Sequence, residues 1–171
     1  MRFDLGLCTL RPWREDDIGA LVRHANNRQV WINLRDRFPH PYTAEEAQRW
    51  LQRASQLEPE TAFAIEIGGE AAGGIGLELQ QDIERLSAEI GFWLGQAHWG
   101  KGIMTNALQF VSERALSGSL VRLYASVLEW NPVSMRVLEK AGYQREGVLR
   151  KAAFKDGRLA DRVLYARVRA D

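Results

Sequence analysis

Residues 87–104 read SAEIGFWLGQAHWGKGIM, and this stretch decides how the chain is organised. Its first eight residues form a short, largely apolar run that is typical of a strand. Gly100 and Gly102 follow, and the apolar spacing after them predicts a helix that ends near Ser117 and Gly118. Val121 to Leu128 is a second strong strand pattern. Strand, helix and strand in this order predict a parallel βαβ unit with a right-handed crossover.

The flanking segments predict further strands and helices. Thr43 and Glu46 have the spacing of a capping box, so we expect a helix to begin there. The other expected elements are a strand at residues 5–10 that Pro12 ends, a helix after Glu15 to Asp17, a helix from Pro132 to Ala141, and hairpins at residues 62–79 and 143–168. An irregular loop, rich in basic and aromatic residues, separates the first two helices. The order β-α-α-β-β-β-α-β-α-β-β predicts a mixed α/β (α+β) fold with a mostly antiparallel central sheet.

Length and composition restrict the class of protein. The chain has 171 residues, of which 46% are hydrophobic and 26% are charged, so residues 1–171 are expected to form a single domain. With 23 basic and 22 acidic residues, the chain lacks the basic excess of a dedicated nucleic-acid binder. No apolar run approaches the roughly 18 residues that span a bilayer, and the N-terminus lacks a signal-peptide core. The lone Cys8 cannot form an internal disulfide, so we expect a cytoplasmic protein.

The Trp-Gly-Lys-Gly sequence at residues 99–102 is a candidate anion site. Two glycines let backbone amides approach a ligand closely, and a helix start adds free N–H groups. The alternative is a tight strand-to-helix turn that needs glycine for its dihedral angles alone. A nucleotide-binding P-loop is disfavoured, because Gly102 stands where a magnesium-binding Ser or Thr would be required.

A second group of polar residues follows the strand at residues 121–128. Asn131 can donate and accept hydrogen bonds with an amide-bearing ligand, or it can cap the helix that begins at Pro132. Capping explains Asn131 and leaves Ser134 without a role. The three histidines show no metal-ligand spacing with Cys8 or with one another, so we expect no metal.

These segments together resemble the GCN5-related N-acetyltransferase (GNAT) family. The resemblance covers nearly the whole chain and rests on the strings AEIGFWL at 88–94, HWGKG at 98–102, NPVS at 131–134 and EKAGY at 139–143. The branch that includes ribosomal-protein N-terminal acetyltransferases is the most similar, also through TLRPW at 9–13 and PHPYTAEE at 39–46. The family fold implies two parallel strands that splay apart at the centre of the sheet, with acetyl-CoA in the gap.

The resemblance also implies roles for named residues. Phe92, Trp93 and Leu94 would line the pantetheine arm of acetyl-CoA, and Asn131 would contact the pantetheine amides. The pyrophosphate would be held by the segment Trp99, Gly100, Lys101, Gly102, Ile103 and Met104. The sequence departs from the broad family at two positions of this segment, since Trp99 replaces Gln or Arg and Met104 replaces Gly or Ala. Backbone donors exist at both positions.

Acetyl transfer to an amine requires a neutral nucleophile and a proton for the departing thiolate. An α-amine has a pKa of about 7.7–8.0 against about 10.4 for lysine, so deprotonating it at neutral pH costs about 3.4 kcal/mol less. Glu89 is the candidate base; the alternative is an outward-facing or salt-bridged glutamate. Leu138 occupies the position of the tyrosine that many relatives use as the acid. Ser134 is therefore the candidate donor to the thiolate, as in the similar branch, with Tyr143 or solvent as alternatives.

The sequence therefore predicts an acetyl-CoA-dependent N-acetyltransferase that acts on a primary amine such as a peptide or protein N-terminus. The alternatives are a small-amine (polyamine or aminoglycoside) acetyltransferase and a non-catalytic acyl-CoA-binding module. The expected partner is the amine-bearing acceptor, with no nucleic acid and no membrane. Six Trp are many for a chain of this length, so some of them are candidates for a homodimer interface or a peptide-binding surface.

Overall fold

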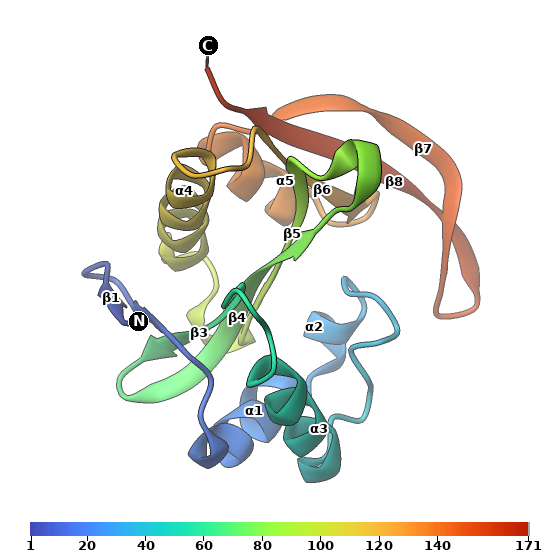
Figure 1. The fold of residues 1–171 in the computed structure, drawn as a ribbon. Helices are drawn as coiled ribbons and strands as arrows, with labels where there is room; N and C mark the ends of the chain where they lie inside the picture. The colour runs from blue at the N-terminus through green and yellow to red at the C-terminus, as the bar shows by residue number, and fades with distance from the viewer. Residues whose placement is uncertain (171) are drawn as a thin grey trace. The chain divides into compact units, whose positions relative to one another are not determined.

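The structure, a computed structural model, describes residues 1–170 and contains one sheet of eight strands in the order β1-β2-β3-β4-β5-β6-β8-β7 (Figure 1). The strands are β1 (Phe3–Asp4), β2 (Thr9–Arg11), β3 (Ala62–Ile67), β4 (Glu70–Leu79), β5 (Ser87–Leu94), β6 (Arg122–Leu128), β7 (Gln144–Lys155) and β8 (Arg158–Val168). The α-helices are α1 (Ile18–Ala25), α2 (Arg28–Trp31), α3 (Ala44–Ala54), α4 (Ile103–Leu116) and α5 (Pro132–Lys140). The predicted mixed α/β class is confirmed. None of the helices in residues 1–170 is long and apolar enough to cross a bilayer.

The predicted hairpins and the parallel unit are present. Gly68 and Gly69 have φ angles of +60° and +87°, which glycine adopts at little steric cost, and they join β3 to antiparallel β4. β5 and β6, on either side of α4 in the chain, pair in parallel from Ser87↔Arg122 to Glu89↔Tyr124. β6 then pairs with antiparallel β8 along its whole length.

Two parts of the predicted element order are wrong. The expected strand at residues 5–10 is a hairpin of β1 and β2, because Gly6 turns the chain with a φ of +79° and the Leu5 amide donates to the carbonyl of Cys8 (2.9 Å). The expected loop between the first two helices contains the additional helix α2. It forms because the side chain of Asn27 accepts from the amide of Gln29 (2.8 Å), which caps the helix.

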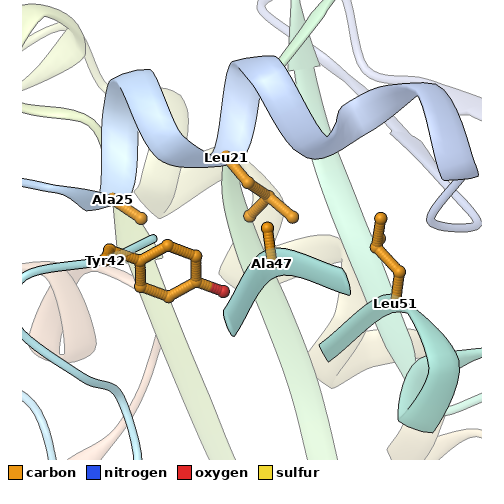
Figure 2. Close-up of a cluster of buried hydrophobic side chains, with 5 residues drawn as sticks. All are labelled: Leu21, Ala25, Tyr42, Ala47 and Leu51. Atoms are coloured by element: carbon orange, nitrogen blue, oxygen red, sulfur yellow. The ribbon is translucent and has the colours of Figure 1, made fainter. Parts of the chain in front are cut away.

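The residues of the chain fall into two compact units, each held together by contacts among its own residues. The first unit comprises Met1–Gly76 and Phe92–Ala107. In it, α1 and α3 pack together through the buried side chains of Leu21, Ala25, Ala47 and Leu51, and Tyr42, which precedes α3, completes this cluster (Figure 2). The predicted start of α3 is confirmed, because the Thr43 hydroxyl accepts from the Glu46 amide (3.3 Å).

A buried ion cluster joins three elements of the first unit. Arg11 ends β2 and is 1% exposed, and its guanidinium donates two hydrogen bonds to Asp17 (2.8 and 2.7 Å). It also donates to Glu66 on β3. The hydrogen bond from Arg11 lowers the pKa of Glu66 below the ordinary glutamate value. The cluster ties the strand that Pro12 ends to the start of α1.

The second unit comprises Leu77–Gly91 and the chain from Leu108 onward. Leu108, Leu123 and Leu138 are fully buried there, on α4, β6 and α5. β7 and β8 form the long hairpin at the right of Figure 1, with β7 at the edge of the sheet. Among the six Trp, all of which lie in the described residues, Trp99 is exposed (40%) and the other five are half-buried.

Candidate active site

The glycine loop lies in the first unit, directly before α4. Gly100 and Gly102 have φ angles of +74° and +76°, a region that L side chains rarely adopt. A Cβ built on Gly100 meets nothing within 4 Å, and one on Gly102 meets only the Leu7 side chain, at 3.9 Å. The turn therefore needs glycine for its dihedral angles, as the simpler interpretation predicts. The open space beside both glycines also leaves room for a ligand against the backbone.

The loop offers main-chain donors more than side chains. The first intrahelical bond at this end of α4 runs from the Asn106 amide to the Gly102 carbonyl (3.0 Å). The amides before Asn106 at the helix start therefore have no carbonyl of the helix to bond. Ile103 and Met104 are buried, so their side chains present little surface to a ligand. The Lys101 ammonium donates to the Ala97 carbonyl (3.0 Å) and the Trp99 indole to the Leu94 carbonyl (2.7 Å).

The end of β5 that precedes the loop also belongs to the first unit. Trp93 packs edge-on against Phe38, with 5.4 Å between ring centroids, and Leu94 is buried. Two glycines of β4, which the sequence reasoning did not single out, permit this packing. A Cβ on Gly73 would lie 2.5 Å from the Trp93 carbonyl oxygen, and one on Gly74 would lie 2.8 Å from its indole nitrogen. The Trp93 ring and the Leu94 side chain therefore face protein, whereas the Phe92 side chain is half-buried.

Glu89 lies on β5 in the second unit, between the buried Ala88 and Ile90. Its side chain is 17% exposed, and Oε1 lies 3.7 Å from Nη2 of Arg162 on β8. The carboxylate is thus half-buried and salt-bridged. Arg162 could not be found from the sequence, since it reaches Glu89 from a strand that follows much later in the chain. A carboxylate in this position is accessible to a water molecule, which is what a water-mediated base requires.

Asn131 and Ser134 are brought together at the start of α5, also in the second unit. The Ser134 amide donates to Oδ1 of Asn131 (3.2 Å), so Asn131 caps the helix. Nδ2 of Asn131 donates to Oγ of Ser134 (2.9 Å). Both residues are half-buried. Capping by Asn131 alone leaves Ser134 without a role. The bond from Nδ2 of Asn131 to the Ser134 hydroxyl connects the two side chains.

The alternative donor Tyr143 faces the interior. It is 3% exposed, and its hydroxyl shares a 2.8 Å hydrogen bond with the Ser112 hydroxyl of α4. Burial raises the pKa of Tyr143 to about 12. Leu138 is fully buried and offers no proton.

The histidines near the glycine loop form a pair. The His24 and His98 ring centroids are 5.5 Å apart, and Nε2 of His24 lies 3.3 Å from a Glu70 carboxylate oxygen. Burial lowers the pKa of His98, and His24 and Lys101 lower it further. His98 is half-buried, not an exposed loop residue as the sequence predicts, because it packs on His24. No group of three or more His, Cys, Asp or Glu residues that could hold a metal ion occurs in residues 1–170.

Known proteins resemble this chain over most of its length. Residues 8–144 match the family model described as an acetyltransferase (GNAT) domain. A ribosomal-protein-serine acetyltransferase from Escherichia coli (strain K12) is 28% identical over 159 residues, which cover 90% of this chain and 88% of that protein. The protein YjcK of Bacillus subtilis (strain 168), named a probable N-acetyltransferase, is 43% identical over 86 residues; this match spans 50% of the chain and about half (48%) of the relative.

A solved structure has the same fold. RimL, described as a ribosomal L7/L12 alpha-N-protein acetyltransferase in complex with coenzyme A, aligns over 98% of both chains with a TM-score of 0.85 and 24% identity. At this identity the similarity concerns the fold alone.

Proposed function

The chain belongs to the GNAT family of acetyltransferases and is an acetyl-CoA-dependent N-acetyltransferase, and we propose that its acceptor is the α-amine of a peptide or protein N-terminus. The observation that carries this proposal is the similarity, over 90% of the chain, to a relative named for acetylating a ribosomal protein. The chemistry of Glu89 and Ser134 supports it. Acetyl-CoA supplies the activated acetyl thioester.

Glu89 is suited to an acceptor that loses its proton easily. A carboxylate is a weak base, and an α-amine with a pKa of about 7.7–8.0 needs far less help at neutral pH than a lysine side chain. In the proposed reaction, Glu89 accepts the amine proton through a water molecule. Arg162, 3.7 Å away, holds the carboxylate on this face of β5.

Ser134 is suited to stabilise the departing thiolate. Its hydroxyl is proposed to donate a hydrogen bond to the thioester sulfur as negative charge builds there. Backbone amides of the segment 99–104 would hold the pyrophosphate, chiefly those at the start of α4, since backbone N–H groups at a helix start bind anions. The Trp99 amide is not free for this, because it donates to the Gln96 carbonyl (3.2 Å). The main chain of Phe92 to Leu94 would face the pantetheine arm. These residues fit the group because the two glycines of the loop leave open space beside the backbone.

A cationic small acceptor is disfavoured by the composition of the segment between α1 and α3. That segment carries Arg28, Arg35 and Arg37 but one acid, Asp36, which does not suit a polyamine or an aminoglycoside. The family assignment favours an enzyme over a non-catalytic acyl-CoA-binding module.

A mixed acceptor screen tests the proposal. Peptides with free N-termini, the same peptides with blocked N-termini and a free lysine, and polyamines are incubated with acetyl-CoA and analysed by mass spectrometry. We expect acetylation of free N-termini and little or none of the blocked lysine peptides. Preferred acetylation of polyamines would overturn the acceptor assignment, and no modification of any amine would support the binding-module alternative.

We also propose that residues 1–171 act as one cytoplasmic catalytic domain. The matched segment 8–144 includes residues of both compact units, which supports a single functional domain. Calorimetry should then record one cooperative unfolding transition, whereas two separate transitions would contradict a single domain.

A further inference from the structure

The side chain of Asn131 makes two hydrogen bonds to the same residue. Oδ1 accepts from the Ser134 amide at 3.2 Å, and Nδ2 donates to the Ser134 hydroxyl oxygen at 2.9 Å. The first bond is an ordinary helix cap. The second is not needed for capping.

The orientation of the Asn131 amide follows from chemistry. A backbone N–H can only donate, so the amide oxygen of Asn131 must face the Ser134 N–H. The amide nitrogen is then on the opposite branch of the planar group, where the Ser134 hydroxyl oxygen lies. The direction of the second bond, from Nδ2 to Oγ, is therefore set by the first.

The residue type at position 131 matters for the second bond. Ser, Thr, Asp and Asn are all good N-cap residues, because each provides an acceptor oxygen. Among these four, Asn alone carries its acceptor and its donor on two separate atoms, because Asp has acceptors only and the single hydroxyl oxygen of Ser or Thr would have to serve both bonds. Helix stability would be served almost equally well by Asp, whereas the bond to the hydroxyl requires Asn.

The second bond decides what the Ser134 hydroxyl can do. A hydroxyl has one proton and two acceptor sites, and here one acceptor site is occupied by Asn131. Its proton must point away from the Nδ2–H group, and no acceptor for it is found within residues 1–170. Ser134 is half-buried, and its hydroxyl proton is the part of the group that is left for donation to a ligand.

We propose that Asn131 is a positioning residue that presets the Ser134 hydroxyl as a hydrogen-bond donor to the departing sulfur. It accepts the helix amide with one branch of its side chain and holds the Ser134 oxygen with the other. The inference rests on the proposed role of Ser134. It differs from the role that the family resemblance implies for Asn131, which is contact with the pantetheine amides.

Two substitutions separate capping from positioning. Asn131→Asp keeps a cap oxygen but replaces the donor by an acceptor, toward which the Ser134 proton would turn. Asn131→Thr keeps a cap oxygen without a charge and lacks the amide N–H. We expect both substitutions to lower kcat about 10- to 100-fold. This is at or below the low end of the rate loss that follows removal of one donor from a well-organised site. The Kd for acetyl-CoA should change less than about threefold.

A double-mutant cycle tests whether Asn131 acts through the Ser134 hydroxyl. In a Ser134→Ala background, the same substitutions should lower kcat by less than about twofold, because the group through which Asn131 acts is already gone. Thr43→Asp is the matched control, since it also places a carboxylate at an N-cap, and it should leave kcat and acetyl-CoA affinity unchanged. A weakened acetyl-CoA affinity in the Asn131 variants, additive with Ser134→Ala, would overturn the inference in favour of a pantetheine contact.

A readout without turnover tests the bond itself. In the ¹⁵N NMR spectrum of the ligand-free protein, the Asn131 side-chain amide should shift and exchange faster with solvent in Ser134→Ala. If it does neither, the bond is absent and the inference is overturned, whatever the kinetics. Full kcat in Ser134→Ala would instead overturn the proposed role of Ser134 and the positioning role that depends on it.

Discussion

Replacing Gly102 should separate the anion-binding role of the glycine loop from its role as a turn. Gly102 has a φ of +76°, and an added Cβ would meet only the Leu7 side chain, at 3.9 Å. The fold therefore loses little through crowding, and the left-handed backbone alone costs about 1–2 kcal/mol. For a chain of this size, that corresponds to a fall in Tm of about 2–8 °C.

The effect on acetyl-CoA should exceed this conformational cost. If the loop amides hold the pyrophosphate, a side chain at Gly102 keeps the charged group away from one or more donors. A hydrogen bond to a charged group contributes about 1.5–3 kcal/mol, so loss of one raises Kd about 10- to 150-fold. We expect Gly102→Ala at the low end of this range and Gly102→Val at the high end.

Calorimetric titration with acetyl-CoA and thermal unfolding measure the two effects separately. Gly69→Ala is the matched control in the same unit, because Gly69 has a φ of +87° and open space around its Cβ position but lies in the β3–β4 turn. It should lower Tm similarly and leave Kd unchanged. Unchanged acetyl-CoA affinity in folded Gly102→Val, or an equal loss in Gly69→Ala, would refute the assignment. Competition by Mg·ATP at comparable affinity would revive the P-loop alternative.

Three other predictions concern single groups. Ser134→Ala should lower kcat about 10- to 100-fold with acetyl-CoA affinity nearly unchanged, because its hydrogen bond forms in the transition state; a full rate in steady-state assays would assign the proton to solvent. Glu89→Gln should lose activity at neutral pH and recover it as pH rises through the α-amine pKa of about 7.7–8.0; a wild-type pH profile would reject Glu89 as the base. The Arg11 hydrogen bond lowers the pKa of Glu66, so its contribution to stability is present above the unfolded glutamate pKa of about 4.3 and is lost as pH falls through the lower folded value. Thermal unfolding against pH should therefore show a steeper acid loss in the wild-type protein than in Glu66→Gln, and parallel curves would contradict the linkage.

Local signals in the sequence predict most of the elements. The Gly-Gly pair at 68 and 69, the hydroxyl at Thr43 and Pro132 act through their own dihedral angles or nearby backbone groups, and each of these elements lies where predicted. The failures are also local. Residues 5–10 look like one apolar strand, and the turn at Gly6 depends on a bond from its amide to Asp4 that composition does not reveal.

The candidate site also combines features that the sequence predicts with features that it does not. The sequence contains the glycine loop, Glu89 and the Asn131 to Ser134 motif as short strings, because each depends on residues a few positions apart. The resemblance of these strings to a known family supplies the expected roles. Nothing in the strings indicates which groups lie beside them in space.

The sequence by itself thus determined the class of fold, the position of most strands and helices, and the short motifs that hold candidate ligands. The tertiary structure alone decided that Arg162 lies beside Glu89, that the Tyr143 hydroxyl is hydrogen-bonded to the Ser112 hydroxyl, and that Arg11 of β2 donates to Glu66 of β3. The physical reason is distance along the chain. Dihedral preferences, caps and turns act over a few residues, whereas these partners meet only when β2 pairs with β3, β8 with β6, and α4 packs in the second unit.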